Sequence, residues 1–171
     1  MQETGHHLAQ FDAGRLIVPN DDPRVVEFMD ASDRVTGAVP RMPGFARMIE
    51  GSAAPETGNT GTCIGSNPRF LAHLAVRDSA EAQENLVWKT ARRRLCERRA
   101  DRCEAPKKQH FAVWRVAAGH GPALTEVFER LAFKQERGAS DRAFGWLSLK
   151  EAQACKTRGP AQVAAAQAAR C

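Results

Sequence analysis

The sequence predicts an α+β fold of ferredoxin-like topology, in which an antiparallel sheet carries helices on one face. Segments with the two-residue alternation of strands and segments with helical spacing follow one another in the order strand, helix, strand, strand, helix, strand, and one further helix is appended. The chain has 171 residues, 43% of them hydrophobic, which is enough for one core and leaves little room for two. We therefore expect residues 1–150 to form a single domain.

The first strand and the first helix are predicted from the turn between them. Residues 7–18 are rich in apolar residues with polar ones interleaved, and they end in a cluster of turn-forming residues. Asp22 followed by Pro23 is typical of a helix start, because the carboxylate caps the first turn and proline fits its first position. Apolar residues then recur at helical spacing, and we expect Gly37 and Pro40 to end this helix.

The central part of the chain predicts two strands separated by a loop. Residues 45–50 alternate weakly after the turn signal of Pro43 and Gly44, which suits a second strand. Residues 51–66 are polar and glycine-rich and show neither period, so we expect a mobile loop. Residues 70–77 alternate clearly and predict the third strand.

The remainder of the chain predicts a long helix, a strand and a last helix. Asp78 with Glu81 three residues later resembles a capping box, and the helix that it begins should stop before Pro106. Residues 110–117 are predicted to form the fourth strand. The last helix is predicted from apolar residues that share one face, namely Leu124, Val127, Phe128 and Leu131. Residues 151–171 hold few large apolar groups, so we expect a disordered tail.

A sheet with helices on one face leaves its second face uncovered. That face must be solvated, bind a ligand or pack on another copy of the chain. We therefore expect two sheets to pair, which gives a homodimer with a dimeric α/β barrel.

The basic charge of the chain is local. Residues 89–108 have a net charge of +6 within a chain of net charge +5, so the remainder is close to neutral. A basic run can contact nucleic acid, but this one lacks interleaved aromatic residues and the chain has no tyrosine. We favour a solvated helix face and predict no nucleic-acid partner.

The sequence lacks the motifs that usually mark several classes of protein. The five cysteines are odd in number and form no CxxC pair, which argues against a disulfide framework and a zinc site and favours the cytoplasm. No apolar run approaches the roughly 18 residues of a membrane span, and the first residues do not read as a signal peptide. HExxH, Walker A, GxGxxG and GxSxG motifs are absent as well. We predict no metal, no cofactor and no membrane partner.

Five segments together resemble a known family: HLAQFDAGRL, DDPRVVEFMDA, PGF, NPRFLAHLAV and KQHFAVWRVAAGHGPALTEVFERLAF. They are similar to the bacterial domain-of-unknown-function family thirty-two ninety-one, over about residues 7–148. The resemblance implies the dimeric α/β-barrel architecture, similar to that of the antibiotic-biosynthesis monooxygenases, and no settled activity. Fold analogy alone supplies no chemistry.

The chain departs from the pattern of this family at pocket positions. Arg47, Arg77 and Arg102 stand where relatives usually carry tryptophan, and Arg92 stands in place of a histidine. Aromatic residues of the long helix are replaced by Leu95, Cys96 and Cys103. One helical face, which looks apolar in relatives, therefore carries three guanidinium groups and is formed by Trp88, Arg92, Leu95, Arg99 and Arg102.

His73 is the candidate catalytic residue. It lies in the middle of the third predicted strand, on the face shared with Arg77, and an imidazole can act there as a general acid or base. A structural histidine with satisfied hydrogen bonds is the alternative. Asp12 with His7 or His110 is a weaker candidate for an acid–base pair, because one sequence fixes no distance between them.

Arginines supply the candidate ligand-binding residues. Arg47 and Arg77 lie on predicted strands and, with Arg92, are suited to a carboxylate or phosphate ligand on the open sheet face. Trp88 and Trp114 complete the predicted ligand-binding set. The alternative is that the arginines extend to solvent or are tolerated without a role.

These observations predict a protein that binds a small organic ligand, with cofactor-independent oxygenase-like or isomerase-like chemistry as one reading. A binding module without turnover is the second reading, and a drifted family member with a decayed pocket is the third. Whether the chain is an enzyme stays open at this point. His120, flanked by glycines in a turn, can face a pocket mouth or serve the turn alone.

Overall fold

A computed structural model describes most of the chain. The described residues are 5–48, 67–88, 94, 98, 101–105, 107 and 110–145. The predicted mobile loop 51–66 and the predicted tail 151–171 lie outside them.

The described chain forms four strands, three α-helices and a short 3-10 helix. In chain order they are β1 (His6–Arg15), α1 (Pro23–Ala38), η1 (Val39–Arg41), β2 (Phe45–Met48), β3 (Phe70–Arg77), α2 (Ala80–Trp88), β4 (Phe111–Ala117) and α4 (Leu124–Arg137). The strands form one sheet in the order β2-β3-β1-β4, and every neighbouring pair is antiparallel. This order, with a helix after β1 and a helix after β3, is the ferredoxin-like topology, so the predicted fold class is confirmed.

Helix starts follow local side-chain chemistry. Asp22 Oδ1 accepts a hydrogen bond of 2.9 Å from the Arg24 backbone N–H, and Pro23 occupies the first turn of α1, as predicted. At α2 the capping residue is Ser79, whose Oγ accepts from the Ala82 N–H at 3.2 Å. The capping residue is therefore one residue after the predicted cap, Asp78, whose carboxylate instead accepts a hydrogen bond from the Ser79 hydroxyl.

The strand register assigns the sheet side chains to two faces. Gln10 pairs with Ala75 and the next residue, Phe11, pairs with Leu74, and directly paired residues share a face. The face that we call the α1/α2 face carries Leu8, Gln10, Asp12, Leu71, His73, Ala75, Arg77, Phe111 and Val113. The opposite face, the α4 face, carries Ala9, Phe11, Ala13, Phe70, Ala72, Leu74, Val76, Ala112, Trp114 and Val116.

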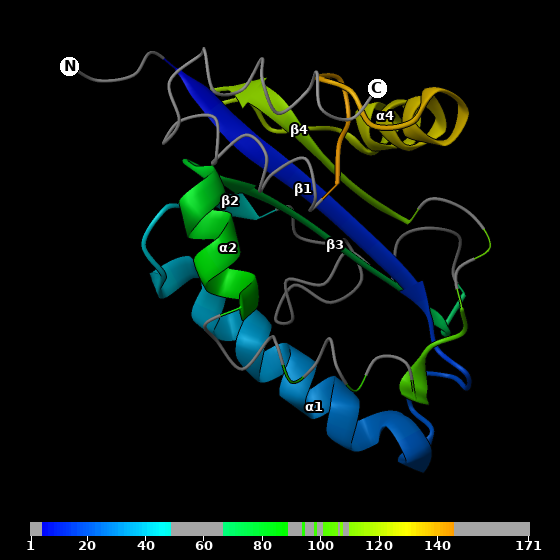
Figure 1. Cartoon of the computed structure of the whole chain (residues 1–171). Coiled ribbons are helices and arrows are strands. Elements are labelled where there is room, and N and C mark those ends of the chain that lie inside the picture. Colours follow the sequence, from blue (N-terminus) through cyan, green and yellow to red (C-terminus); the bar gives the residue numbers. More distant parts are fainter. Residues whose placement is uncertain are drawn as a thin grey trace, which may run out of the picture.

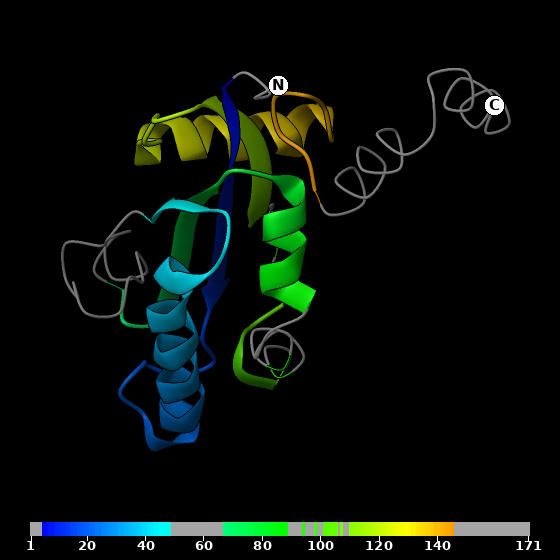
Figure 2. The same cartoon turned by 90° about the vertical axis from the view of Figure 1, so that its left-hand side faces the viewer.

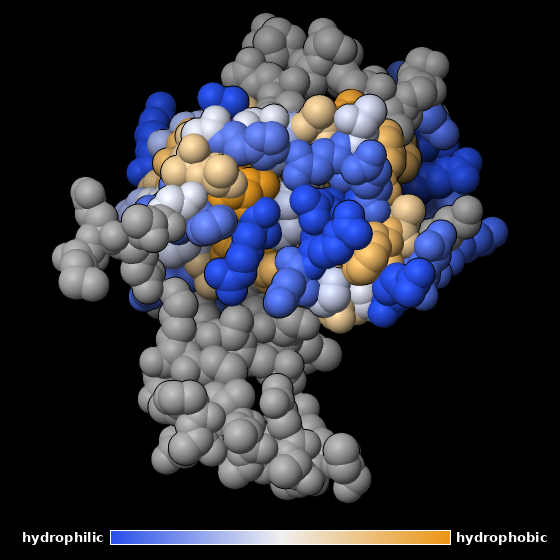
Figure 3. Space-filling model, turned by 90° about the horizontal axis from the view of Figure 1, so that it is seen from above, coloured by the Kyte–Doolittle hydropathy of each residue, from blue (hydrophilic) through white to orange (hydrophobic). Residues whose placement is uncertain are grey.

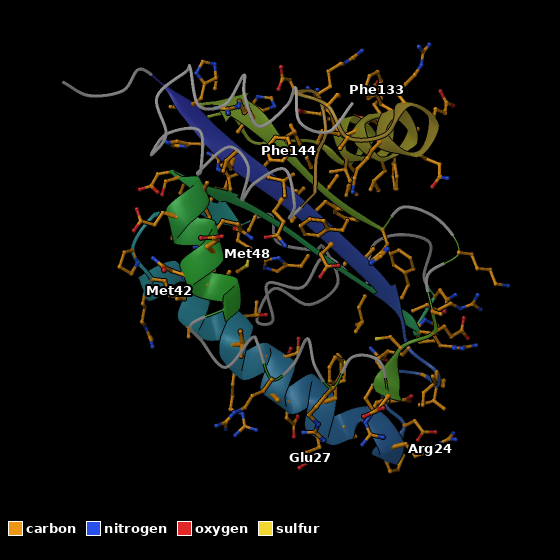
Figure 4. All side chains as sticks on the ribbon, viewed as in Figure 1. Arg24, Glu27, Met42, Met48, Phe133 and Phe144 are labelled. Carbon is orange, nitrogen blue, oxygen red and sulfur yellow. The ribbon has the colours of Figure 1, made fainter. Side chains whose placement is uncertain are left out.

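Helices α1 and α2 lie on one side of the sheet and α4 lies on the other (Figures 1 and 2). Ala80 at the start of α2 packs with Leu8 and Val113, and Phe28 of α1 belongs to a cluster that Leu71 joins. Phe144, labelled in Figure 4, closes the layer between α2 and the sheet at the β4 edge, because its backbone pairs with Val113. The space over the α1/α2 face is therefore a layer of side chains enclosed between the sheet and the helices α1 and α2.

The α4 face is covered within a single chain. Val127 and Leu131 of α4 pack against its apolar residues, which include Leu74 and Trp114 and are buried. The expectation that this face stays open is therefore wrong, because the apolar stripe of the last helix needs an apolar surface and finds it there. The described surface on the α4 side of the molecule is mainly hydrophilic, with small apolar areas (Figure 3). Phe128, predicted for the packed stripe, is instead 47% exposed.

Candidate functional site

Polar side chains line the α1/α2 face in the middle of the sheet. Arg77 on β3 pairs with Leu8 at one end of the ladder, and His73 pairs with Asp12 three positions before the other end. Gln10 lies between these pairs on β1. Arg77 is fully buried, Gln10 is 2% exposed, and His73 and Asp12 are half-buried. A face that packs under helices is thus polar at positions where a purely structural sheet is apolar.

His73 and Asp12 face each other across β1 and β3. Directly opposed residues of an antiparallel pair have Cβ atoms about 4.5–5.5 Å apart, so the carboxylate stands beside the imidazole. The sequence suggested His7 or His110 as the partner of Asp12; β1 instead places His7 on the opposite face. The arrangement of His73 and Asp12 suits an imidazole whose tautomer and charge are supported by a neighbouring carboxylate.

A second buried amide comes from α2. Gln83 is 1% exposed and lies one helical turn after Ala80, whose side chain packs on the α1/α2 face. Gln83 therefore lies in the same layer as Gln10. Gln10 Oε1 and Gln83 Nε2 are both buried, and neither has a hydrogen-bond partner among the residues that the structure describes. Buried polar atoms are nearly always paired in folded proteins, so one acceptor and one donor are available in this layer.

The structure brings together only part of the predicted site. His73 and Arg77 share a face, as predicted, and Trp88 ends the helix that covers that face, although its side chain lies outside the described residues. Arg92 also lies outside the described residues. The amides of Gln10 and Gln83 were missed, because a neutral amide has no charge pattern or motif spacing that marks it in a sequence.

Arg47 and Arg77 do not form one anion site, and this prediction is wrong. Phe45 pairs with Arg77, but Arg47 pairs with Val76, because a register shift lies between Phe45 and Arg47. A bulge of this kind inverts the alternation of a strand and places Arg47 on the α4 face.

Trp114, predicted as a ligand-binding residue, also lies on the α4 face. It is fully buried and its indole Nε1–H donates a hydrogen bond of 2.8 Å to Glu126 Oε1. Its side chain is therefore on the side of the sheet opposite His73 and Arg77.

Glu126 is the centre of a second polar cluster, at the start of α4. Its Oε2 lies 2.7 Å from His120 Nε2, and Arg130 Nη2 lies 3.6 Å from its Oε1. Burial opposes ionisation of Glu126, but the hydrogen bonds from His120 and Trp114 and the nearby positive charges outweigh it and lower its pKa. The sequence is compatible with either a pocket or a turn role for His120, and it does not mark Glu126 as a functional residue. The one available signal is that Glu126 follows His120 by six residues, at the start of the predicted last helix.

The basic segment makes at least one ion pair with α1. Arg98 Nη2 lies 3.2 Å from Glu27 Oε2, and Glu27 is labelled on α1 in Figure 4. Among the residues that the structure describes, no group of three or more His, Cys, Asp or Glu side chains is placed to hold a metal ion. No helix in these same ranges has both the length and the apolar character of a membrane span.

Comparison with known families gives one match that covers most of the chain. The family described as Domain of unknown function (DUF3291) matches residues 7–160. The chain belongs to the DUF3291 family. The resemblance noted in the sequence is thereby confirmed, and the DUF3291 match extends ten residues beyond the predicted domain end at residue 150.

A solved structure from Nitrosomonas europaea, described as a candidate antibiotic biosynthesis monooxygenase, is also similar to this DUF3291 protein. It has 12% sequence identity and a TM-score of 0.46, and the aligned region covers 72% of this chain and 100% of that chain. A similarity of this size supports no argument about activity. No curated protein matches the chain.

Proposed function

We propose that this DUF3291 protein binds a small organic molecule in the layer between the sheet and α2. The observation that carries the proposal is the pair of buried amide atoms, Gln10 Oε1 and Gln83 Nε2, for which the described part of the chain offers no hydrogen-bond partner. An unpaired buried polar group costs about 1–3 kcal/mol, so a layer that served folding alone would be more stable with leucine there. A ligand that donates to Gln10 and accepts from Gln83 removes this cost.

The charge of the layer indicates the class of ligand. Arg77 places a guanidinium in the same buried layer, and guanidinium groups are suited to carboxylates and to other delocalised oxyanions. The ligand we propose is therefore a small molecule with an anionic oxygen and an adjacent donor and acceptor, as in a hydroxy-substituted aromatic carboxylate.

His73 supplies the acid–base chemistry in this proposal. With Asp12 opposite, its imidazole takes a proton from a phenolic or enolisable position of the ligand, and Arg77 stabilises the resulting anion. Returning the proton to a different carbon is an isomerisation. In the oxygenase reading, a CH2 group reacts with O2: the carbon loses both hydrogens and four electrons to become C=O, one oxygen atom enters that carbonyl, and the other leaves as water.

Thermal unfolding with salicylate and related hydroxybenzoates tests the binding step. Ligand should raise the melting temperature of the wild type, and the shift should be lost in Gln83→Leu and Arg77→Met. Arg41→Gln is the matched control, because Arg41 is exposed in η1 and its loss should leave the shift intact. No shift for any hydroxybenzoate in the wild type would count against the proposal.

The same assay separates catalysis from binding. In the enzyme reading, mass spectrometry detects a converted ligand with the wild type and none with His73→Gln, which should still bind. Retention of unchanged ligand by the wild type would identify a binding module without turnover. The third alternative, a family member with a decayed pocket, would be supported by two results together. The melting temperature would rise in Arg77→Trp, and no ligand would change the melting temperature of the wild type.

We also propose that the protein forms a homodimer, as the family resemblance implies. Since α4 covers the α4 face, the second copy would contact α4, and Phe128 is the large apolar residue exposed on that helix. Light scattering should give about twice the chain mass of 18.7 kDa, and Phe128→Glu should give the single mass. A wild-type monomer at micromolar concentration would overturn this.

A further inference from the structure

The cluster around Glu126 lies on the opposite side of the sheet from the proposed ligand layer. His120 belongs to the turn between β4 and α4, and Glu126 belongs to the first turn of α4. The indole of Trp114, fixed in the core, holds one carboxylate oxygen while the imidazole of His120 meets the other. The imidazole is therefore positioned by the core although its own side chain is 46% exposed.

The contact with Glu126 determines which nitrogen of the His120 imidazole can bind another group. Nε2 lies 2.7 Å from Glu126 Oε2 and serves the carboxylate, which leaves Nδ1 for an external group. Anchoring the turn would need only one such contact. The second hydrogen bond, from a buried indole to the same carboxylate, adds orientation to the imidazole, as in sites where a histidine must present one nitrogen.

A guanidinium from another strand lies beside the same turn. A Cβ atom at Gly121 would be 2.3 Å from Arg47 Nη1, so the Arg47 side chain rests against the residue that follows His120. This approach depends on the bulge that places Arg47 on the α4 face. Within the described part of the chain, Arg47 makes no ion pair, so its charge is available beside the turn that carries His120.

We propose that His120 and Arg47 form a binding site for a small oxyanion, separate from the ligand layer on the α1/α2 face. Arg47 supplies a permanent positive charge and two or more N–H donors, and His120 donates from Nδ1 when the imidazole is protonated. Glu126 stabilises the imidazolium and fixes its orientation. The ligand is a phosphate or a carboxylate group, which share this chemistry.

The anion would contact the Arg47 guanidinium and the Nδ1 edge of the His120 imidazole. The other charged and polar groups around the imidazole are Glu126 and Arg130 from α4 and the indole of Trp114 from β4. The lowered pKa of Glu126 favours its carboxylate, which orients the imidazole without binding the anion itself.

Titration with inorganic phosphate, and separately with acetate, tests the site in the full chain. Imidazole and guanidinium NMR signals should shift on addition of either anion. His120→Gln and Arg47→Gln should each weaken binding by about tenfold or more. Comparing the two titrations shows whether the site prefers a phosphate or a carboxylate.

Gly121→Ala is the variant that tests the geometry with every charge kept. Its Cβ must displace the Arg47 guanidinium, whose flexible end can move at little cost to folding, so binding should weaken while the melting temperature holds. Arg41→Gln, an exposed arginine in η1, is the control and should change nothing. Equal losses in Arg41→Gln, unchanged binding in Gly121→Ala, or no phosphate binding at millimolar concentration would overturn the proposal.

Discussion

Gly44 lies so close to Ala82 that a Cβ atom at residue 44 would be 2.3 Å from the Ala82 Cβ and 2.6 Å from Asp78 Oδ1. Its φ of 77° is in the left-handed region that favours glycine. The Gly44 carbonyl also accepts a hydrogen bond of 3.0 Å from the Asp78 N–H. The turn before β2 is thereby held against the start of α2, the helix that covers the proposed ligand layer.

Gly44→Ala should destabilise the protein by about 1–3 kcal/mol, because both the backbone conformation and the contact with α2 oppose a side chain. Gly37→Ala is the matched control. Nothing lies within 4 Å of a Cβ at residue 37, which is in α1, so alanine there should be neutral or stabilise by up to about 1 kcal/mol. Urea unfolding measures both, and equal effects would refute the packing argument at Gly44.

The packing of α4 on the sheet predicts unequal effects for two valines. Val127 is fully buried against the α4 face, and Val26 on α1 is 42% exposed. Val127→Ala should cost about 2 kcal/mol, whereas Val26→Ala should stay within about 0.5 kcal/mol of the wild type. Both substitutions are in helices, so the gain in helix propensity is the same. Similar free energies of unfolding for the two variants would show that α4 does not cover the sheet in solution.

Features of the fold set by local chemistry were predictable from the sequence. Asp22 and Pro23 mark the start of α1, and the alternation over residues 70–77 predicts β3 with the bounds found in the structure, Phe70–Arg77. The position of Arg47 was not predictable, because a bulge is decided by the pairing of β2 with β3 and inverts the alternation on which the prediction rests. The face of the sheet on which α4 packs was also not predictable, because the apolar stripe of a helix shows that it packs on an apolar surface but does not show which one.

The candidate site also has a part that local sequence predicts and a part that only tertiary packing creates. His73 and Arg77 are four residues apart on one strand, so the strand period alone predicted their shared face. Gln10 and Gln83 are buried on the α1/α2 side of the sheet through tertiary packing, and what marks them is that each has a buried polar atom without a hydrogen-bond partner among the described residues. Glu126 gains its role from the turn that brings His120 back onto α4.

The cap of α1 gives a prediction about acid stability. The Asp22 carboxylate accepts hydrogen bonds from the side chain and the backbone N–H of Arg24, which lower its pKa to about 2. A carboxyl group whose pKa is lowered by folding adds stability above its ordinary pKa, and this stability is lost as the pH falls toward 2. Asp22→Ala should therefore lower the melting temperature at pH 7 and have little effect near pH 2. Asp22→Ser, which keeps a capping oxygen, should recover part of the loss. A deficit in Asp22→Ala that is as large at pH 2 as at pH 7 would contradict this account.

Glu126 gives a second, independent prediction about pH. Hydrogen bonds from His120 and Trp114 outweigh the effect of burial and lower its pKa, so the folded state favours the carboxylate. The carboxylate therefore contributes stability above the ordinary glutamate pKa of about 4.3, and the contribution disappears as the pH falls through the lowered value. The melting temperature of the wild type should exceed that of Glu126→Gln at pH 6, and the two should converge as the pH approaches 3.

Glu129→Gln is the control for this series. Glu129 is exposed on the same helix and makes no ion pair with any residue that the structure describes, so its substitution should change the melting temperature little at either pH. Convergence in Glu126→Gln alone would assign the acid sensitivity to the contacts with His120 and Trp114. A constant difference between wild type and Glu126→Gln down to pH 3 would mean that shape, and not charge, is what Glu126 contributes, and the imidazole of His120 would then lack the ionised partner that orients it.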